Sequence, residues 1–315
     1  MKKKIFIDGE EGTTGLQIYK KLSIHPEIEV IKIDKKFRKD LEKRRRMMEF
    51  SDVTFLCLPD QAAKEAVKIC NGLGYKSPIL IDASSAHRIC KDWVYGLPEL
   101  SSKQRINISI AKRISVPGCY ATGATVLLSP LLKGSILDKS TKFIIQAISG
   151  YSGGGKKLIN HFNQNDSEPF FYYGLNLNHK HLPEITHHND LKNTPIFIPS
   201  VANFYQGMIV NLPLHIEYLK KAYTFEDVIN VITDKYSNSQ FVKVEQYHSS
   251  FSEDGFYRPD KVINTNNIYI SFFVNKVTKQ MVISSNFDNL GKGASSAAIQ
   301  CMNIALGFDE SLSLI

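Results

Sequence analysis

The chain has 315 residues, of which 43% are apolar and 22% are charged, and its formal net charge is +8 at pH 7. At roughly 150 residues per domain this length predicts about two domains, and the composition excludes a disordered chain or a small disulfide-stapled scaffold. The excess of positive charge suits anionic partners, but no nucleic-acid-reading module accompanies it, so binding to nucleic acid is not expected.

Short β-branched runs alternate with helical patterns in the N-terminal third of the chain. This alternation is typical of a parallel sheet whose strands are joined by helical crossovers. The predicted strands are Ile5 to Ile7, Val30 to Ile33, Val53 to Leu58, Ile79 to Ile81 and Ile106 to Ile110, and the predicted helices are Thr14 to Ser23, Lys39 to Glu49 and Gln61 to Asn71. We therefore predict a Rossmann-like, doubly wound α/β domain. Its dense basic run, Lys35 to Arg46, is interpreted as a solvated helix face.

The pattern changes from Thr141 onwards. Lys142 to Ser149, Pro195 to His215 and Asn267 to Val274 have the partly alternating pattern of long strands, with few helices between them. This predicts a second, α+β domain with a mostly antiparallel sheet. The Ala-rich segment Gly293 to Leu306 predicts a helix that packs back on the first domain. The expected domains are residues 1–118 with 286–315, and residues 119–285.

The first strand-to-helix turn is rich in glycine and reads Gly9-Glu10-Glu11-Gly12-Thr13-Thr14-Gly15. Glycines there permit a tight turn and the close approach of a pyrophosphate, and the helix N-terminus offers N–H donors to an anion. In a doubly wound pattern the turn predicts dinucleotide binding, although such glycines also occur in simple turns. Asp34, at the end of the next strand, could bind the ribose of NAD, whereas Lys35, Lys36 and Arg38 could hold the 2′-phosphate of NADP. These residues alone leave the choice open.

A cysteine stands between a strand and an apolar helical run, in the segment Val116-Pro117-Gly118-Cys119-Tyr120-Ala121-Thr122-Gly123. At such a junction the helix dipole and the free N–H groups favour the thiolate, which lowers the pKa and raises the nucleophilicity at neutral pH. Isolated cysteines usually serve packing, and we interpret the other four in that way. Cys119 is the candidate nucleophile.

A second glycine-rich segment follows the strand that ends at Ser149, and it reads Gly150-Tyr151-Ser152-Gly153-Gly154-Gly155-Lys156-Lys157. It has the opening of a P-loop, but Lys157 stands where Ser or Thr would bind Mg²⁺, which disfavours an ATPase. Consecutive glycine N–H groups can form a concavity for an anion, with Lys156 as counter-charge. A flexible hinge is the alternative.

Histidines gather in the segment His179-Lys180-His181-Leu182-Pro183-Glu184-Ile185-Thr186-His187-His188. Their spacing fits neither an H-E-x-x-H helix nor paired cysteine ligands, so a metal site is disfavoured. A histidine that acts as base and then as acid beside a nucleophilic cysteine is favoured. We interpret His187 and His188 as surface residues.

The five cysteines are few and widely separated, without a C-x-x-C pair. This spacing argues against a disulfide framework and predicts a reducing, cytoplasmic location. The apolar run after the basic start stops at Ile7, too short for a signal peptide, and no stretch approaches the ~20 apolar residues of a membrane helix. We expect a protein that is neither exported nor embedded in a membrane.

Together these pieces resemble a known family, the N-acetyl-gamma-glutamyl-phosphate reductases of arginine biosynthesis, and within it the shorter type 2 subfamily. The resemblance runs along nearly the whole chain, and several rare motifs in one order make it more specific than any single glycine turn. Besides the segment from Val116 to Gly123, the motifs are Asp8-Gly9 with Gly12-Thr13-Thr14-Gly15-Leu16-Gln17-Ile18, Asp82-Ala83-Ser84-Ser85-Ala86-His87-Arg88, Tyr95-Gly96-Leu97-Pro98-Glu99-Leu100, Ser149 to Lys157, His179 to Ile185 and Asn289-Leu290-Gly291-Lys292-Gly293-Ala294. Ser85 stands where Thr is commoner in the family.

The resemblance implies an NADP-dependent, phosphorylating aldehyde dehydrogenase. It would reduce N-acetyl-L-glutamyl 5-phosphate with NADPH to N-acetyl-L-glutamate 5-semialdehyde and phosphate, through a thioester on Cys119. His181 would transfer the proton, with His179 as the alternative. The resemblance also implies a homo-oligomer, a dimer or a tetramer, in which residues 1–118 and 286–315 bind NADP(H) and residues 119–285 carry catalysis and assembly.

The motifs and the resemblance assign further residues to two sites. The residues expected at the cofactor are Gly9, Gly12, Thr13, Thr14, Gly15, Lys35, Arg38, Ser84, Asn289 and Lys292. The residues expected at the substrate are Ser152, Gly153, Gly154, Lys156, His179, Lys180 and Glu184. No metal is expected.

Two other functions stay open at this point. An aspartate-semialdehyde-dehydrogenase-like enzyme, acting on another acyl phosphate, would share the architecture and the cysteine thioester. The residues after Cys119, Tyr120-Ala121-Thr122-Gly123, argue against it, and they also lack the Thr-Thr-Asn usual in glyceraldehyde-phosphate dehydrogenases. A non-catalytic NADP-binding regulator is the alternative from a different class, and the presence of both Cys119 and His181 argues against it.

Overall fold

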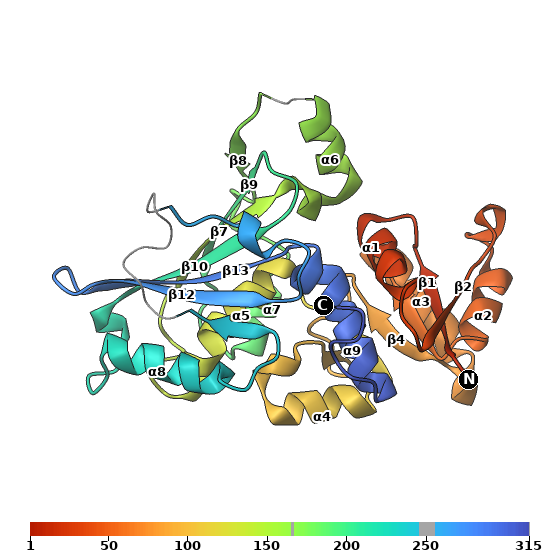
Figure 1. Ribbon diagram of the computed structural model, residues 1–315, viewed down its shortest axis with the longest axis horizontal. Helices are drawn as coiled ribbons and strands as arrows, with labels where there is room; N and C mark the ends of the chain where they lie inside the picture. Colours follow the sequence, from red (N-terminus) through yellow and green to blue (C-terminus); the bar gives the residue numbers. More distant parts are fainter. Residues whose placement is uncertain (165–166, 246–255, 315) are drawn as a thin grey trace. The chain divides into compact units, whose positions relative to one another are not determined.

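The computed structural model describes residues 1–164, 167–245 and 256–314, and the chain forms two compact units (Figure 1). Unit 1 comprises Met1–Gly118 and Ala294–Ile315, and unit 2 comprises Cys119–Gly293. The chain returns to unit 1 later than the predicted residue 286. Asn286 and Phe287 still pair with neighbouring strands of the second sheet, so residues 286–293 belong to unit 2.

Unit 1 contains a sheet in which every strand pairing is parallel, in the order β2-β1-β3-β4-β6-β5. This confirms the predicted doubly wound sheet. The strands are β1 (Lys3–Asp8), β2 (Ile28–Ile31), β3 (Val53–Leu56), β4 (Ile79–Asp82), β5 (Val94–Tyr95) and β6 (Arg113–Ser115). The carboxyl ends of β1 and β2 therefore lie next to each other at one edge of the sheet, where a dinucleotide binds in folds of this kind.

In the described part of unit 1, α-helices accompany this sheet. They are α1 (Thr13–Leu22), α2 (Leu41–Glu49), α3 (Asp60–Asn71), α4 (Ser102–Ile110) and α9 (Ser296–Leu306). Met48 of α2 and Ala66 of α3 share one apolar cluster with Phe6 of β1, while α9 contacts β4, α1 and α4. The C-terminal helix thus completes the first unit, as predicted.

Two predictions for unit 1 are wrong. Ile106 to Ile110 forms the end of α4 and not a strand, because Ser101 caps the helix by accepting a hydrogen bond from the Gln104 N–H at 3.0 Å. The alternating isoleucines nevertheless leave only Ile108 buried. The basic run Lys35 to Arg46 is not uniformly solvated, because Arg44 is buried and donates to the buried Asp8 carboxylate at 2.7 Å.

Unit 2 contains a mixed sheet, with the order β11-β12-β13-β10-β7-β9-β8 among the described residues. Only the pairs β7·β9 and β11·β12 are parallel, so the sheet is mostly antiparallel, as predicted. The strands are β7 (Ile144–Gly150), β8 (Phe170–Tyr172), β9 (Ile196–Ala202), β10 (Met208–His215), β11 (Val242–Val244), β12 (Ile268–Asn275) and β13 (Gln280–Phe287). The run Pro195 to His215 is two strands joined by a turn.

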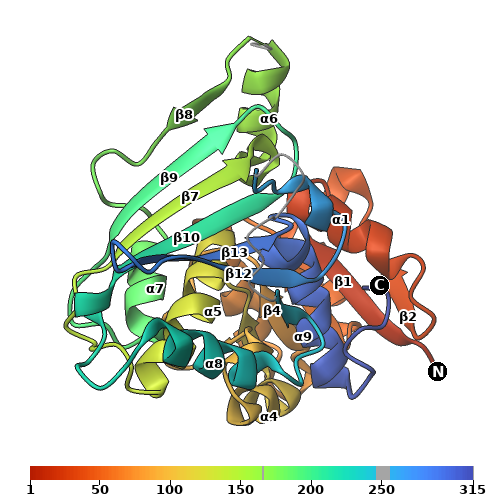
Figure 2. The ribbon, with the colours of Figure 1, turned by 60° about the vertical axis from the view of Figure 1, so that its left-hand side comes forward.

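The helices of unit 2 are α5 (Cys119–Lys133), α6 (Gly155–Gln164), α7 (Leu182–His188) and α8 (Phe225–Tyr236). Figure 2 shows α5, α7 and α8 together on one face of the sheet. Helix α5 is buried along its length because it contacts β10 and β13 as well as α7 and α8. This packing fixes the N-terminus of α5, where Cys119 lies. Among the described residues, no helix combines the length and the apolar character needed to span a bilayer.

Candidate active site

Cys119 is the first residue of α5, and its side chain is partly exposed. The N–H groups of the first turn of an α-helix have no partner within the helix, and together with the helix dipole they would favour a thiolate at this position. The backbone of Gly293 passes directly against the cysteine, because a Cβ on Gly293 would lie 2.8 Å from the Cys119 Cβ. A larger residue at 293 would displace the thiol.

Both predicted imidazoles lie beside Tyr120, the residue that follows Cys119. The Tyr120 ring centroid is 5.8 Å from that of His179 and 5.8 Å from that of His181. The His181 backbone N–H donates to His179 Nδ1 at 3.2 Å, and the two rings are 4.8 Å apart. Both side chains are buried. Unit 2 thus brings together the nucleophile motif and the histidine motif, which are far apart in the sequence.

The neighbouring residues of the histidine motif differ in exposure. Lys180 is exposed, which leaves its ammonium group in solvent. Glu184 lies in the first turn of α7 and is buried. The motif therefore directs His179, His181 and Glu184 into the protein, whereas Lys180 and His187 are exposed.

The sequence analysis missed a group of hydroxyls around Tyr120. The Tyr120 hydroxyl donates to the Ser200 carbonyl oxygen at 3.2 Å and also hydrogen-bonds with the side chains of Tyr173 and Ser149. Burial raises the pKa of Tyr120 and of Tyr173, and the negative charge of a Cys119 thiolate acts in the same direction. Both tyrosines therefore stay neutral hydroxyls at neutral pH. No motif indicated Tyr173, because only the folding of the chain brings it to Tyr120.

The glycine-rich segment after β7 is held in place by a neighbouring turn. The N–H groups of Gly150 and Ser152 donate to the carbonyl oxygens of Gly207 and Tyr205, at 2.9 Å and 3.1 Å. Gly155 has a φ of +68°, which lets the chain enter α6 directly. Such backbone hydrogen bonds are typical of an ordered loop rather than of a hinge. Gly153 and Gly154 are exposed on this loop, and Lys156 is exposed in the first turn of α6.

Asn289 connects this loop to the turn after β9. Its amide donates to the Ser152 hydroxyl at 2.9 Å, and its carbonyl oxygen accepts from the Gly207 N–H at 2.7 Å. The predicted cofactor residue Asn289 and the predicted substrate residue Ser152 are therefore direct partners inside unit 2. Lys292 also belongs to unit 2, where it is buried with its ammonium group 5.5 Å from the centre of the Phe241 ring.

The glycine turn of unit 1 has the close packing expected of a dinucleotide site. Gly9 has a φ of +94°, and a Cβ there would lie 2.3 Å from the Cys57 carbonyl oxygen. A Cβ on Gly15 would lie 2.4 Å from the Gly9 carbonyl oxygen. Gly12 caps α1 without any side-chain hydrogen bond, so the N–H groups at Thr13 and Thr14 can bind an anion. The turn therefore fits a pyrophosphate.

The basic residues after β2 lie beside the same turn. The Lys35 ammonium group is 3.2 Å from a Glu11 carboxylate oxygen, and Arg38 donates to the other oxygen of the same carboxylate. The hydrogen bond from Lys35, together with the charge of Arg38, lowers the pKa of Glu11. Asp34 instead accepts from the Lys36 N–H at 3.1 Å, as the cap of a short 3₁₀ turn.

Ser84 is buried in a polar cluster at the end of β4. Its hydroxyl and its backbone N–H donate to the two carboxylate oxygens of Asp82, at 2.8 Å and 2.9 Å. His87 Nδ1 lies 2.6 Å from the same carboxylate, and the His87 ring stacks on Trp93 with the centroids 4.3 Å apart. This cluster fixes the loop after β4. The sequence analysis did not assign roles to Asp82 or His87.

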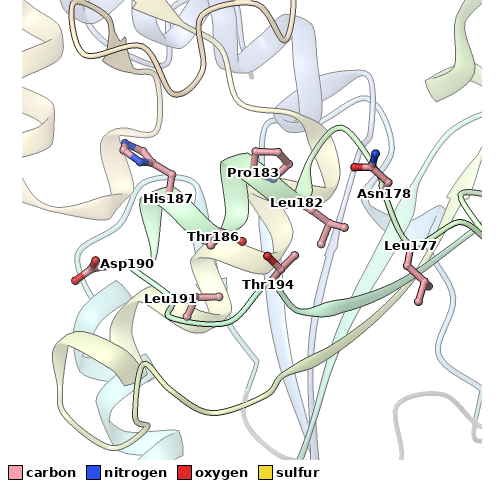
Figure 3. A pocket seen from close by; sticks show the side chains of 9 residues that line it. All are labelled: Leu177, Asn178, Leu182, Pro183, Thr186, His187, Asp190, Leu191 and Thr194. Atoms are coloured by element: carbon pink, nitrogen blue, oxygen red, sulfur yellow. The ribbon is translucent and has the colours of Figure 1, made fainter.

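Unit 2 has a groove of about 780 Å³ along the outer side of α7 (Figure 3). It is lined by Leu177, Asn178, Leu182, Pro183, Thr186, His187, Asp190, Leu191 and Thr194. None of the predicted site residues lines it, although Asn178 and Leu182 are chain neighbours of His179 and His181. In the described parts of the chain, His, Cys, Asp and Glu side chains nowhere gather in a group of three that could hold a metal.

Comparison with protein families divides the chain in the same way as the fold. Residues 4–108 match the model for the NAD binding domain of semialdehyde dehydrogenases, and residues 119–289 match the model for their dimerisation domain. Among solved structures, aspartate semialdehyde dehydrogenase II from Vibrio cholerae is similar with a TM-score of 0.73 at 11% identity, covering 98% of this chain and 99% of that one. The enzyme from Francisella tularensis gives a TM-score of 0.72 at 17% identity, over 96% and 99% of the two chains. At these identities the likeness shows the fold.

Curated relatives show the family. N-acetyl-gamma-glutamyl-phosphate reductase from Trichormus variabilis is 42% identical over 99% of each chain. The protein of the same name from Burkholderia cenocepacia is 38% identical over 96% of this chain and 97% of its own. The residues of the Cys119 cluster and the glycine turn thus lie in a chain that matches these relatives from end to end. The chain belongs to the N-acetyl-gamma-glutamyl-phosphate reductase family of the semialdehyde dehydrogenases.

Proposed function

We propose that this chain reduces N-acetyl-L-glutamyl 5-phosphate to N-acetyl-L-glutamate 5-semialdehyde, with NADPH as the reductant and phosphate as the second product. The observation that carries the proposal is the position of Cys119 at the N-terminus of α5, with His179 and His181 packed around the adjacent Tyr120. An acyl phosphate needs a nucleophile that is ionised at neutral pH, and a partly exposed thiolate at a helix N-terminus meets this need.

The Cys119 sulfur would attack the carbonyl carbon of the acyl phosphate. The C–S bond forms, the bond between the acyl carbon and the bridging oxygen breaks, and phosphate leaves with that oxygen and the electron pair, which gives a thioester. When bound, the reduced nicotinamide supplies the hydride for the thioester carbonyl. We assign His181 as the proton donor to the thiohemiacetal oxygen or to the departing thiol, with His179 as the alternative donor. Both imidazoles are buried, which keeps water from competing with this transfer.

The substrate carries two anionic groups, the α-carboxylate and the phosphate that leaves. The backbone N–H groups of the exposed residues Gly153 and Gly154, the Lys156 ammonium group and Lys180 are our candidates for holding them. Ser152 and Asn289 keep this loop in place through their mutual hydrogen bond. Glu184 is buried one helical turn after His181, and we assign it to the support of the histidine motif.

We propose that unit 1 binds NADPH. The N-terminus of α1 would hold the pyrophosphate, and Lys35 and Arg38 would hold the 2′-phosphate, because both cations lie at the edge of this turn. Loss of one such charge-assisted contact costs on the order of 1.5 to 3 kcal/mol, so Lys35→Ala or Arg38→Ala should raise KM for NADPH about tenfold. Steady-state kinetics with NADPH and NADH test this assignment. An unchanged KM for NADPH in both variants would show that other residues bind the 2′-phosphate.

We also propose that the chain works as a homo-oligomer, a dimer or a tetramer, assembled through unit 2. The face of the second sheet opposite to α5 carries exposed isoleucines on adjacent strands, with Ile144 directly opposite Ile196 in the β7·β9 register. Ile198 extends this row. Apolar side chains that neighbour one another on a sheet face are typical of a surface covered by a partner.

The proposed reaction is tested in the reverse direction. We expect phosphate-dependent reduction of NADP⁺ with N-acetyl-L-glutamate 5-semialdehyde, and much slower reduction with the free, non-acetylated semialdehyde. Equal rates with the two substrates would show that the enzyme does not recognise the acetyl group, but they would leave the proposed thioester reaction in place. Activity with L-aspartate semialdehyde alone would favour the aspartate-semialdehyde-dehydrogenase-like alternative. A protein that binds NADPH but turns over none of these substrates would be a regulator.

A further inference from the structure

The two cations that we assign to the 2′-phosphate, Lys35 and Arg38, already form ion pairs with a carboxylate of the protein. Glu11 lies within the glycine turn, between Gly9 and Gly12, and binds both Lys35 and Arg38. Each of its carboxylate oxygens contacts one of the two cations. Phosphate groups in proteins are commonly bound by the same two kinds of side chain, lysine and arginine.

The contact follows from the topology of the sheet. Strands β1 and β2 pair in parallel, so the turn after β1 and the basic segment after β2 emerge at the same edge, as Figure 1 shows for the two strands. In a doubly wound fold the adenosine ribose lies between the helix N-terminus and the end of the second strand. A 2′-phosphate on this ribose would therefore lie next to Lys35 and Arg38, the cations that pair with Glu11.

We propose that Glu11 occupies the position of the 2′-phosphate in the cofactor-free protein and thereby reduces the preference of this enzyme for NADPH over NADH. This inference rests on the assignment of Lys35 and Arg38 to the 2′-phosphate under the proposed function. A bound 2′-phosphate must displace the Glu11 carboxylate or remain beside it, and both raise the free energy of the complex. The 2′-hydroxyl of NADH carries no charge and can donate a hydrogen bond to the same carboxylate, so NADH does not meet this penalty.

The exposure of the three side chains limits the size of the effect. Glu11 and Arg38 are each 48% exposed and Lys35 is 77% exposed, so the ion pairs are screened by solvent. Exposed ion pairs of this kind contribute little individually, and Glu11 therefore modulates the cofactor preference without abolishing NADPH binding. The same exposure lets the carboxylate swing away without unfolding the turn.

The test compares Glu11→Gln with a matched control on the neighbouring residue. Glu10 pairs with Lys32 at 3.3 Å and contacts neither Lys35 nor Arg38, so Glu10→Gln changes the net charge equally and leaves the two cations unchanged. Isothermal titration calorimetry with NADPH, NADH and adenosine 2′,5′-bisphosphate measures affinity without turnover. We expect Glu11→Gln to bind NADPH and the bisphosphate about three- to tenfold more tightly than the unmodified protein, with NADH unchanged or weaker. The gain should shrink as the salt concentration rises. Glu10→Gln should show less than half of it.

The outcomes separate the inference from the assignment on which it rests. If the unmodified protein prefers NADPH and Glu11→Gln leaves all three affinities unchanged, the role of Glu11 is refuted and the cofactor assignment stands. If the unmodified protein shows no preference and Glu11→Gln creates one, the role of Glu11 is supported while the proposed preference for NADPH fails. An equal gain in affinity for NADPH in Glu10→Gln would show that the effect comes from the change in net charge alone, and it would also refute the inference.

Discussion

At the scale of single residues, the candidate site joins groups that are distant in the sequence. Cys119 and the pair His179 and His181 were predictable because each lies in a short motif whose chemistry is local: a thiol at a helix start, and imidazoles beside a turn. Tyr173 and Asp82 were not predictable. Their roles depend on hydrogen bonds to Tyr120 and to Ser84, which exist only once the strands have assembled.

The two histidines make the first prediction. His181→Asn should lower kcat by about 10²- to 10⁴-fold with little change in KM, because it removes the proposed proton donor but not a substrate contact. His179→Asn is the matched variant and should have a smaller effect on kcat, since its Nδ1 is engaged with the His181 backbone N–H. Steady-state kinetics of the two variants test the assignment. A larger loss of kcat in His179→Asn than in His181→Asn would identify His179 as the proton donor.

At the scale of elements, the site depends on where strands and helices begin and end. The glycine turn and the apolar strands predicted β1, β3 and β4 closely, because continuous β-branched runs between turns admit few alternatives. The segment Ile106 to Ile110 misled the prediction, since alternation of isoleucine with polar residues fits a strand and also fits a half-exposed helix such as α4. Only the cap at Ser101 separates the two.

Arg44 connects α2 to β1 directly before the glycine turn. Its guanidinium group donates twice to the Asp8 carboxylate, and both side chains are buried. Burial raises the pKa of Asp8, against the opposing effect of Arg44. Arg44→Ala should therefore lower the free energy of unfolding by about 3–5 kcal/mol, because it leaves a buried carboxylate without its cation.

Urea denaturation measures this loss, with the neighbouring Arg45→Ala as control. Arg45 is 43% exposed and its nearest carboxylate, on Glu42, is 4.0 Å away. The control should change the free energy of unfolding by about 0.5 kcal/mol or less. Equal effects of the two substitutions would show that the buried pair does not anchor α2.

At the scale of the whole molecule, the division into two units follows the change of sequence pattern near residue 119. The sequence predicted this change because parallel and antiparallel sheets have different hydrophobic patterns. The sequence pattern predicts a return to unit 1 at residue 286, whereas the pairing of Asn286 and Phe287 in β13 keeps the chain in unit 2 until Gly293. The link between Glu11 and the cations after β2 was not predicted either, because it crosses from one turn to another.

Assembly of the molecule gives a further prediction. If copies associate through the isoleucine row of unit 2, Ile198→Lys should shift the oligomer towards a monomer, because the charge cannot be buried without a partner. Ile110→Lys places the same charge on α4 of unit 1, where the isoleucine is 76% exposed, and should leave the mass unchanged. Light scattering after gel filtration distinguishes the two. An unaltered oligomer in Ile198→Lys would locate the interface elsewhere.

The formation of a covalent bond at Cys119 is the step on which the proposed reaction depends. Mixing the protein with NADP⁺ and N-acetyl-L-glutamate 5-semialdehyde in the absence of phosphate isolates this step, since the thioester forms but cannot be released by phosphorolysis. We expect a rapid burst of NADPH equivalent to the number of active sites, and an N-acetylglutamyl group on the peptide that contains Cys119, as read by mass spectrometry. Cys119→Ser should bind NADPH normally and give neither the burst nor the adduct. A burst that persists in Cys119→Ser, or an acyl group found on another residue, would contradict the account.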